Sequence, residues 1–431
     1  MIASQPSPVS TDTVYPASAP VTVRGLSLAI VWLTICSSSI VYTDPAPYDA
    51  LMLGLIVLLP MVGLAAFSPG VNWFLVAWLL VAAGGLVASM RSSVLDVATT
   101  HTLVSLYLSM SAVLIAAFVS KDPARHGRLI MSALCFAAMI AALAGMLGYF
   151  DILPGARGLF TKFDRARGLF KDPNVYGPFL VPPLLYFLHG MITARAARAM
   201  LHGFLGGIVA LGLLLSFSRG AWINAGMSLL VYGYILFVTV STNRLRIKLL
   251  AIAVFAACAA VLGLLAALQV ESIAALIGER ASFSQSYDLG PDGRFAGQVK
   301  AFGIIAANPL GIGALEFGRT FDNEDVHNVY LSMFLNAGWL GGFTYLGLVL
   351  ATLAAGFRMS LRRGPLQGVS IVLFAAFAGL AAEGMVVDTD HWRLFYILMG
   401  LVWGVVLGEV RQVFVQSFYR SGAPYAAPYR L

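Results

Sequence analysis

The chain has 431 residues, of which 59% are hydrophobic and only 11% are charged. Soluble globular domains carry about 25% charged residues, so this composition excludes an ordinary soluble protein and indicates an integral membrane protein. The formal net charge of +7 requires no nucleic acid partner, because basic connectors anchor a membrane protein at the inner leaflet.

Apolar runs long enough to cross the roughly 30 Å of bilayer hydrocarbon recur along the whole chain. The strands of a membrane barrel would alternate polar and apolar residues, and these runs do not alternate. The sequence therefore predicts an all-α integral membrane protein with about twelve transmembrane helices. The predicted spans are residues 26–43, 50–67, 72–90, 99–120, 129–150, 174–194, 199–217, 220–243, 249–270, 326–357, 366–387 and 392–410.

The predicted organisation is one membrane domain, residues 25–414, between two tails. Residues 1–24 and 415–431 have the composition of disordered segments, and both are expected in the cytoplasm. The first 23 residues lack a basic cluster followed by a short apolar core, so no cleaved signal peptide is expected.

Basic residues predict which ends of the spans face the cytoplasm. With a cytoplasmic N terminus, the inner connectors hold Lys121, Arg125, Arg128, Arg195, Arg198, Arg244, Arg246, Lys248, Arg358, Arg362 and Arg363. This distribution follows the positive-inside rule. It leaves two notable outer segments: a connector at 151–173, and a large loop at 271–325 between the ninth and tenth predicted helices.

The connector at 151–173 has the opposite charge from that expected on the outer side. Its basic residues are Arg157, Lys162, Arg165, Arg167 and Lys171, and its acids are Asp151, Asp164 and Asp172. Arginine binds phosphate bidentately, so a basic outer pocket suits an anionic ligand. The alternative is a solvated connector whose charges pair with the local aspartates. Pro173 and Asn174 are expected to end the connector and begin the next span.

Two further polar residues lie at predicted outer boundaries. Arg219 occupies a tight connector, LLLSFSRGAWINAG, where it is expected to face a polar partner or cavity, or else to snorkel to the headgroups. His327 follows Glu324 and Asp325, which favour a helix start, and is expected in the first helical turn. There the helix dipole disfavours the imidazolium, and a neutral histidine is what a general base requires. The alternative is a histidine that caps the helix or satisfies a loop hydrogen bond.

The outer loop and the run after it carry two structural predictions. The spacing of Phe295, Val299 and Phe302 predicts an amphipathic helix along the membrane surface, either covering a cavity or simply packing. The run 326–357 is too long for one span. The residues that offer a break in it are Asn336, Gly338, Gly341 and Gly342.

A last outer connector, DTDHWR, contains Asp388, Asp390 and His391. A DxD pair can hold magnesium or manganese against a pyrophosphate, but hydrogen bonding to nearby arginines is the favoured interpretation. Glu383 is the one clear acid inside an apolar run. It is expected to face the same outer cavity as the DTDHWR connector.

Four motifs occur in order: RARGLFKDPNVYGPF, LSFSRGAWI, GRF followed by NPLGIG, and DVHNVYLSMFLNAGWLGG. Over about 160–345, this pattern resembles the bacterial O-antigen ligase and polymerase family, multi-spanning glycosyltransferases of the GT-C class. The resemblance implies an inner-membrane enzyme with a periplasmic active site and no metal or other cofactor. The donor it implies is a glycan on undecaprenyl pyrophosphate. The acceptor is the lipid A core for a ligase, or a growing polysaccharide for a polymerase.

The resemblance also assigns site residues. It implies that Arg165 and Arg219 hold the pyrophosphate and that His327 is the general base. Further substrate contacts are expected from Arg167, Lys171, Asn174, Arg294, Asn328 and Tyr330. One rival is a transporter or flippase for lipid-linked sugar, which needs the arginines but no base; ionisable groups near mid-bilayer, usual in transporters, are nearly lacking here. A second rival is a non-catalytic component of polysaccharide assembly.

Overall fold

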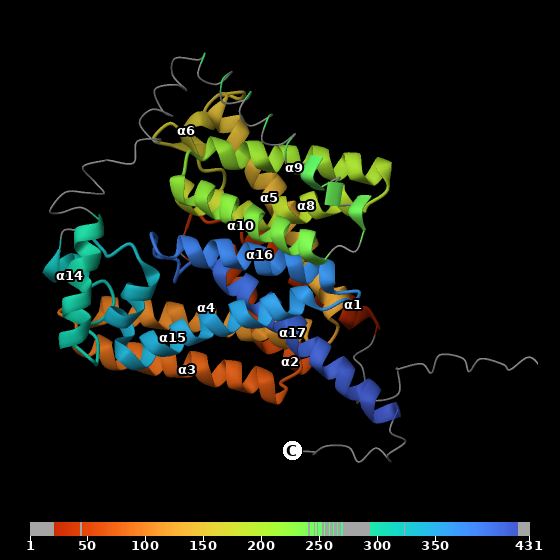
Figure 1. Ribbon diagram of the computed structural model, residues 1–431. Coiled ribbons are helices and arrows are strands. Elements are labelled where there is room, and N and C mark those ends of the chain that lie inside the picture. Colours follow the sequence, from red (N-terminus) through yellow and green to blue (C-terminus); the bar gives the residue numbers. More distant parts are fainter. Residues whose placement is uncertain are drawn as a thin grey trace, which may run out of the picture.

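The protein is an assembly of long helices (Figure 1). This computed structural model describes residues 21–43, 45–239, 294–322 and 324–420, and scattered positions between 242 and 269. The described strands, β1 (Thr161–Lys162) and β2 (Arg165–Ala166), form one short hairpin. The all-α prediction is therefore confirmed.

The described helices follow the predicted spans closely. They are α1 (Val21–Ser37), α2 (Pro47–Met61), α3 (Pro69–Ser89), α4 (Leu95–Val119), α5 (Pro123–Tyr149), α6 (Ala156–Phe160), α7 (Pro173–Phe179), α8 (Val181–Thr193), α9 (Ala196–Leu215), α10 (Arg219–Thr239), α14 (Arg294–Ala307), α15 (Val329–Leu361), α16 (Gln367–Glu383) and α17 (Arg393–Arg420), with a π-helical turn, η2 (Phe317–Phe321). The predicted span 249–270 lies largely outside the described residues.

Within the described part of the chain, eight helical segments are long and apolar enough to cross a membrane. Shorter apolar helices occur in α1, α2, α14 and α16. The integral membrane fold is thus supported by length and composition, while a total of about twelve spans stays a prediction. The predicted tails fall mostly outside the described residues, although α1 begins at Val21 and α17 continues to Arg420.

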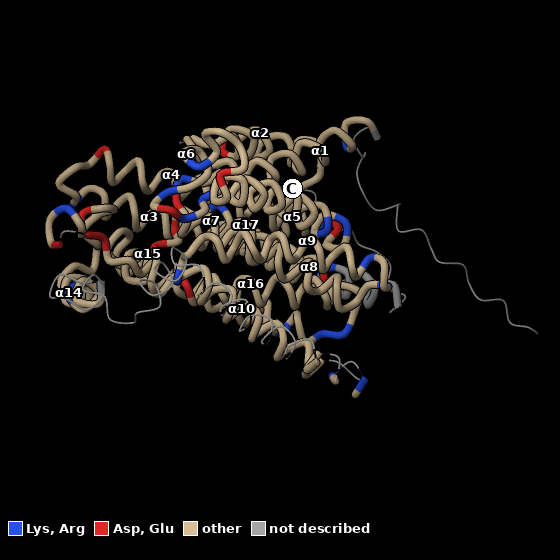
Figure 2. The backbone as a smooth tube through the Cα atoms, turned by 90° about the horizontal axis from the view of Figure 1, so that it is seen from above, with Lys and Arg blue, Asp and Glu red and all other residues tan. Residues whose placement is uncertain are grey.

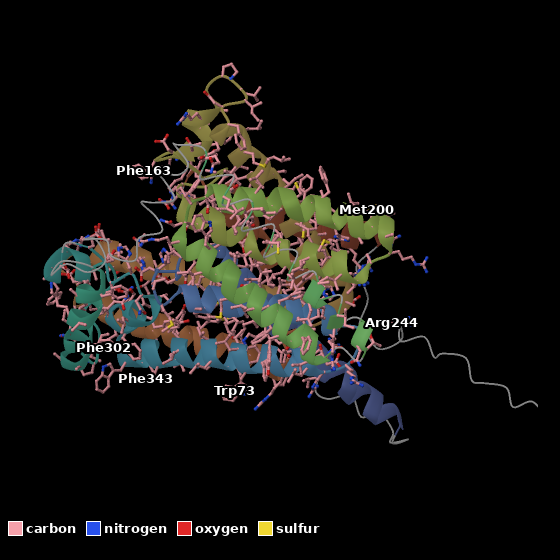
Figure 3. All side chains as sticks on the ribbon, turned by 45° about the horizontal axis from the view of Figure 1, so that its top comes forward. Trp73, Phe163, Met200, Arg244, Phe302 and Phe343 are labelled. Atoms are coloured by element: carbon pink, nitrogen blue, oxygen red, sulfur yellow. The ribbon has the colours of Figure 1, made fainter. Side chains whose placement is uncertain are left out.

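Charged residues concentrate toward the two ends of the helix assembly (Figure 2). One end, called the site end below, carries the connectors 150–172, 216–218 and 384–392 and the segment 308–328. The opposite end carries the connectors predicted to be cytoplasmic. Figure 3 shows Phe163 and Phe302 toward the site end and Arg244 toward the other. The alternation of connectors agrees with the predicted topology; which end faces the cytoplasm stays a prediction.

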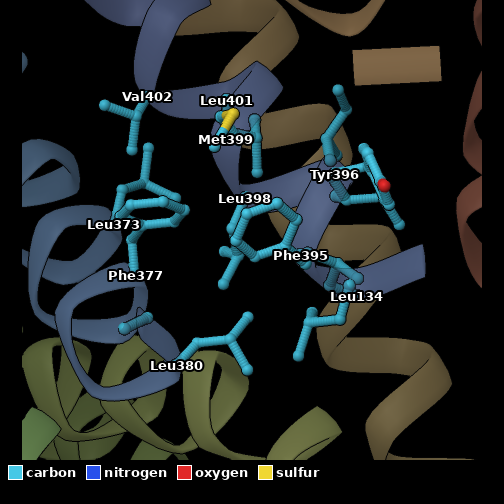
Figure 4. Close-up of a cluster of buried hydrophobic side chains, with 14 of the residues drawn as sticks. Leu134, Leu373, Phe377, Leu380, Phe395, Tyr396, Leu398, Met399, Leu401 and Val402 are labelled. Atoms are coloured by element: carbon cyan, nitrogen blue, oxygen red, sulfur yellow. The ribbon is translucent and has the colours of Figure 1, made fainter. Parts of the chain in front are cut away.

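The core lies where α16 and α17 pack beside α5 (Figure 4). Leu134, Phe377, Phe395 and Leu398 are each no more than 1% exposed there. On the outside of the assembly many large apolar side chains are exposed, such as Leu230 at 72%. An apolar exterior is what lipid requires, because hydrocarbon tails are as apolar as leucine.

α15 is two helices joined by a kink at Gly338, where φ is 65° and ψ is −171°. A side chain at this position would lie 2.7 Å from the carbonyl oxygen of Pro309, so glycine allows both the left-handed backbone and this close approach. The kink leaves the Trp339 N–H without a partner inside the helix, and this N–H donates to the same Pro309 carbonyl at 2.8 Å. The predicted break in this run is confirmed.

The predicted helix in the outer loop is also confirmed, as α14. Its Ala301 is fully buried in a small second core that also contains Ile312, Phe317, Val326, Leu331 and Leu335. Phe302 and Val299 are 63% and 73% exposed (Figure 3 labels Phe302). An outward apolar face suits contact with lipid, and this placement on the membrane surface stays a prediction.

Candidate functional site

The hairpin at the site end positions Arg165. Phe163 and Asp164, the two residues between the strands, have φ values of 53° and 54°, as a type I′ turn requires. The turn pairs Lys162 with Arg165 and directs β2 inward, so that Arg165 is only 6% exposed. The local sequence thus brings a guanidinium into the protein rather than into solvent.

Arg165 is held by two polar partners from other elements. Its Nε donates to the carbonyl of Ser216 at 2.8 Å, and its Nη2 donates to Asn174 Oδ1 at 2.8 Å. Asn174 lies in the first turn of α7, which begins at Pro173 as predicted and is capped by Asp172. Two fixed hydrogen bonds preorganise the orientation of the guanidinium plane.

The remaining basic residues of the connector are mostly paired locally. Arg157 contacts Asp164 at 2.7 Å, and Lys162 contacts Asp172 at 3.3 Å. For these two, pairing with the local aspartates describes the structure correctly. Arg165 differs from them, because its hydrogen bonds join the connector to α7 and to the turn after α9.

The other two predicted cations of the connector lie in different settings. Arg167 donates from Nη2 to the Leu159 carbonyl at 3.1 Å, and its guanidinium lies over the Tyr42 ring at 5.8 Å. These contacts hold the connector together and bind Arg167 to the protein itself. Lys171 is exposed near the entrance to α7.

The turn between α9 and α10 brings Arg219 to the same region. Ser218 Oγ donates to Asn174 Oδ1 at 2.9 Å and also lies 3.3 Å from the Ala221 N–H, near the start of α10. Asn174 is therefore a shared acceptor for Arg165 and Ser218. Arg219, the first residue of α10, is half-buried and follows a turn that Arg165 contacts directly.

A buried acid lies beside the start of α10. Glu383, the last residue of α16, is 0% exposed, and its Oε2 accepts from Asn224 Nδ2 at 2.8 Å. A side chain at Gly220 would lie 2.8 Å from Glu383 Oε1. The absence of a side chain at Gly220 thus lets this carboxyl group approach the residue next to Arg219, and the expectation that Glu383 faces the site region is consistent with this contact.

His327 is not in the first turn of a helix, so that prediction is wrong. Its φ is 51°, and α15 begins two residues later, at Val329. The helix start is decided by Asn328, whose Oδ1 accepts from the N–H groups of Tyr330 and Leu331 at 3.1 and 3.2 Å. Asparagine is a strong N-cap. The helix therefore begins after Asn328, and not after Glu324 or Asp325 as predicted.

Carboxyl groups flank His327. Its Nε2 lies 3.3 Å from Glu324 Oε2, and its Nδ1 lies 3.8 Å from Asp388 Oδ2. Asp388 is fixed in turn by Ser332, whose Oγ donates to Asp388 Oδ1 at 2.6 Å. Burial raises the pKa of Asp388 to about 7, and the charge of Asp390 acts in the same direction. Arginines were expected near His327, but its charged neighbours among the described contacts are the acids Glu324 and Asp388.

The structure brings the regions of the three predicted catalytic residues to one end of the protein. Arg165 reaches the turn before Arg219, and Gly220 lies beside Glu383, because a Cβ there would be 2.8 Å from Glu383 Oε1. The next residue, Gly384, accepts a hydrogen bond from the Val329 N–H at 2.9 Å, two residues after His327. A continuous series of direct contacts therefore links the connector, the start of α10, the end of α16 and the start of α15.

The other predicted binding residues have varied surroundings. Asn328 uses its side-chain oxygen to cap α15. The Tyr330 hydroxyl donates to the Ala381 carbonyl at 2.6 Å, which turns it toward α16. Arg294 begins α14, and its side chain lies outside the described part.

The two aspartates of the DxD motif do not share a partner. Asp388 contacts His327 and Ser332, whereas Asp390 lies 3.5 Å from Nε2 of His101. His101 belongs to α4 and was not recognised in the sequence, because a single histidine near the start of an apolar run has no local signal. Its stacked neighbour, His391, completes a separate group.

Residues 204–346 match the model of the family described as O-antigen ligase. The matched segment includes the turn at Arg219, His327 and the start of α15, and it covers three of the four motifs. The first motif, RARGLFKDPNVYGPF, which contains Arg165, lies before the matched segment. No curated protein matches the chain.

Proposed function

We propose that this chain is a membrane glycosyltransferase of the O-antigen ligase family, whose model residues 204–346 match, and that it takes its glycan from undecaprenyl pyrophosphate. The acceptor is a hydroxyl group on the lipid A core or on a growing polysaccharide. The observation that carries the proposal is the buried guanidinium of Arg165, bound to the turn that leads into Arg219. In this proposal the site end faces the periplasm, an orientation that the basic connectors at the other end favour.

In this proposal Arg165 and Arg219 stabilise the leaving diphosphate. Bond cleavage at the anomeric carbon transfers an electron pair to the pyrophosphate oxygen, so negative charge grows on the leaving group. Guanidinium groups fixed in advance in a partly dehydrated site stabilise such charge strongly, because they need no reorganisation during the reaction. The two hydrogen bonds on Arg165 supply this preorganisation.

His327 acts as the general base for the acceptor. As the acceptor oxygen bonds to the anomeric carbon, its proton moves to Nε2 of His327. Asp388 lies beside Nδ1 and is held by Ser332, so its carboxylate orients the ring and stabilises the imidazolium that forms. Glu324 is exposed and lies near Nε2. Its carboxylate has to move away from Nε2 so that the acceptor hydroxyl can approach this nitrogen. General base catalysis of this kind typically contributes about 10²–10⁴-fold.

The test is transfer by purified protein in detergent. Lipid-pyrophosphate-linked oligosaccharide and a matching acceptor are supplied, and new glycosidic product is measured by gel or mass spectrometry. We expect product from the wild type and at least about 100-fold less from Arg165→Ala, Arg219→Ala and His327→Ala. If the protein were a transporter or a non-catalytic component, even the wild type would form no product. Wild-type rates in all three variants would overturn the roles assigned to these residues.

The product separates the two kinds of acceptor. A ligase attaches the whole lipid-linked chain to a lipid A core. A polymerase extends one lipid-linked or polysaccharide chain with another. Offering each acceptor separately to the same preparation therefore shows which reaction the enzyme performs.

A further inference from the structure

A group of metal-ligating side chains lies at the site end, apart from the arginines and His327. His101 comes from the first turns of α4, and Asp390 and His391 come from the connector before α17. One potential ligand atom from each lies within 4.8 Å of the others. We propose that these three side chains bind one divalent transition-metal ion of the zinc type, in addition to the transfer activity.

The ligand types and spacing suit such an ion. Zinc binds histidine nitrogen at about 2.0–2.1 Å and carboxylate oxygen at about 2.0–2.2 Å. At a tetrahedral angle two such ligand atoms stand about 3.4 Å apart, and His101 Nε2 lies 3.5 Å from Asp390 Oδ2. Two imidazoles with one carboxylate favour transition metals over magnesium or calcium, which prefer oxygen ligands alone.

Hydrogen bonding leaves a nitrogen of His391 available to a metal. Ser105 Oγ lies 3.1 Å from the His101 carbonyl, to which its hydroxyl can donate, and 2.9 Å from His391 Nε2. When the hydroxyl donates to the carbonyl, Nε2–H of His391 donates to Ser105, and the lone pair of the neutral ring lies on Nδ1. Metal binding through Nδ1 selects this tautomer. Metal-bound histidines characteristically donate their second nitrogen in this way, which fixes the ring and its tautomer.

The electrostatics of the group also call for a cation. Asp390 is 6% exposed, and a buried carboxylate is costly unless it is paired. Among the described residues its ion-pair partner is His101 rather than a lysine or arginine. The rings of His101 and His391 stack with centroids 3.9 Å apart and planes at 24°, so two imidazolium charges would repel. A metal ion satisfies the carboxylate while both rings stay neutral.

A small cavity adjoins the group. His101, Ser105, Thr102 and Asn336 are among its lining residues, and its volume of about 20 Å³ is enough for one water molecule. A water there would complete the coordination that three protein ligands leave open. Because the ligands join α4 to the connector 384–392, the ion would also fix the segment that carries Asp388.

The experiment measures metal binding and needs no glycan. Full-length protein purified in detergent without a polyhistidine tag is stripped with a chelator, given Zn²⁺, desalted and analysed for zinc by mass spectrometry. Competition with a chromophoric chelator gives the affinity. We expect one equivalent of zinc in the wild type, and at least about tenfold weaker binding in His101→Gln and His391→Gln. His202→Gln, a histidine variant on α9, is the matched control and should bind as the wild type does.

Asp390→Asn keeps the shape of the side chain. It is the ligand variant to use if a histidine variant fails to fold. The midpoint of thermal unfolding should rise with Zn²⁺ in the wild type and in His202→Gln, and stay unchanged in the ligand variants. The proposal is overturned if the folded wild type retains no more zinc than His101→Gln, or if all the ligand variants bind like the wild type. Neither result depends on transfer activity.

Discussion

Arg165 donates a 2.8 Å hydrogen bond to the backbone carbonyl of Ser216, 51 residues further along the chain. This bond joins the basic connector to the turn from which α10 starts, and Arg219 is the first residue of that helix. Two cations that are distant in sequence are thereby held in adjoining elements. Because the bond depends on the shape of the guanidinium, a variant that keeps the charge and changes the shape tests its role.

Arg165→Lys should lose most of the transfer activity although the positive charge is kept. Lysine is a compact point charge and cannot hydrogen-bond Ser216 and Asn174 with the flat fork of a guanidinium. We expect a fall of at least about tenfold in the initial rate, measured with lipid-linked donor in detergent. The control is Arg157→Lys, because the ion pair of Arg157 with Asp164 is exposed. Equal rates for both variants would contradict the geometric role of Arg165.

Gly220→Ala should destabilise the protein because it crowds a buried acid. The new methyl group would lie 2.8 Å from Glu383 Oε1, and overpacking of this kind costs about 1–3 kcal/mol. Gly226→Ala in the same helix is the control, since a side chain there meets nothing within 4 Å. Thermal unfolding in detergent should show a lower midpoint for Gly220→Ala only. Similar midpoints for both variants would show that Glu383 moves aside freely.

Glu316 should make the stability of the protein sensitive to acid. Burial acts to raise its pKa, but hydrogen bonds from Thr320, Ser92 and Ser93 leave the pKa below the ordinary value of 4.5. The carboxylate therefore contributes stability above that value, and this contribution is lost as the pH falls through the lower pKa of the folded state.

Glu316→Gln is the variant that tests this contribution. It should unfold at a lower temperature than the wild type at neutral pH, and the difference should shrink as the pH is lowered through 4.5 and on past the lower pKa of the folded state. Asp164→Asn, in an exposed ion pair, serves as the comparison and should show little change. A gap between Glu316→Gln and the wild type that is constant across this range would argue against the carboxylate as its source.

Asn328 should matter through the helix it caps. Asn328→Ala removes the acceptor for two N–H groups at the start of α15, and losing such a cap costs about 1 kcal/mol. Asn328→Asp keeps an acceptor oxygen and should restore most of this stability, as measured by thermal unfolding. If Asn328→Asp were no more stable than Asn328→Ala, the cap would not be the source of the effect.

Much of the fold follows from local patterns in the chain. Apolar runs and their lengths predicted helices where the described structure has them, because lipid leaves the backbone no other partner than its own carbonyl groups. The kink at Gly338 and the helix α14 were likewise visible, since a permissive residue and a helical repeat are both local signals. The start of α15 was misjudged because two acids and an asparagine all qualify as caps, and geometry selected Asn328.

The sequence by itself determined an all-α membrane protein, the alternation of its connectors and the motifs that mark Arg165, Arg219 and His327. Only the tertiary structure decided which side chains meet: that Arg165 binds Ser216, that Asp388 approaches His327, and that Asp390 joins His101 instead. The physical reason is that hydropathy and turn preferences act within a few residues of the chain. Contacts between polar side chains at the ends of helices depend on how those helices pack, which no local pattern specifies.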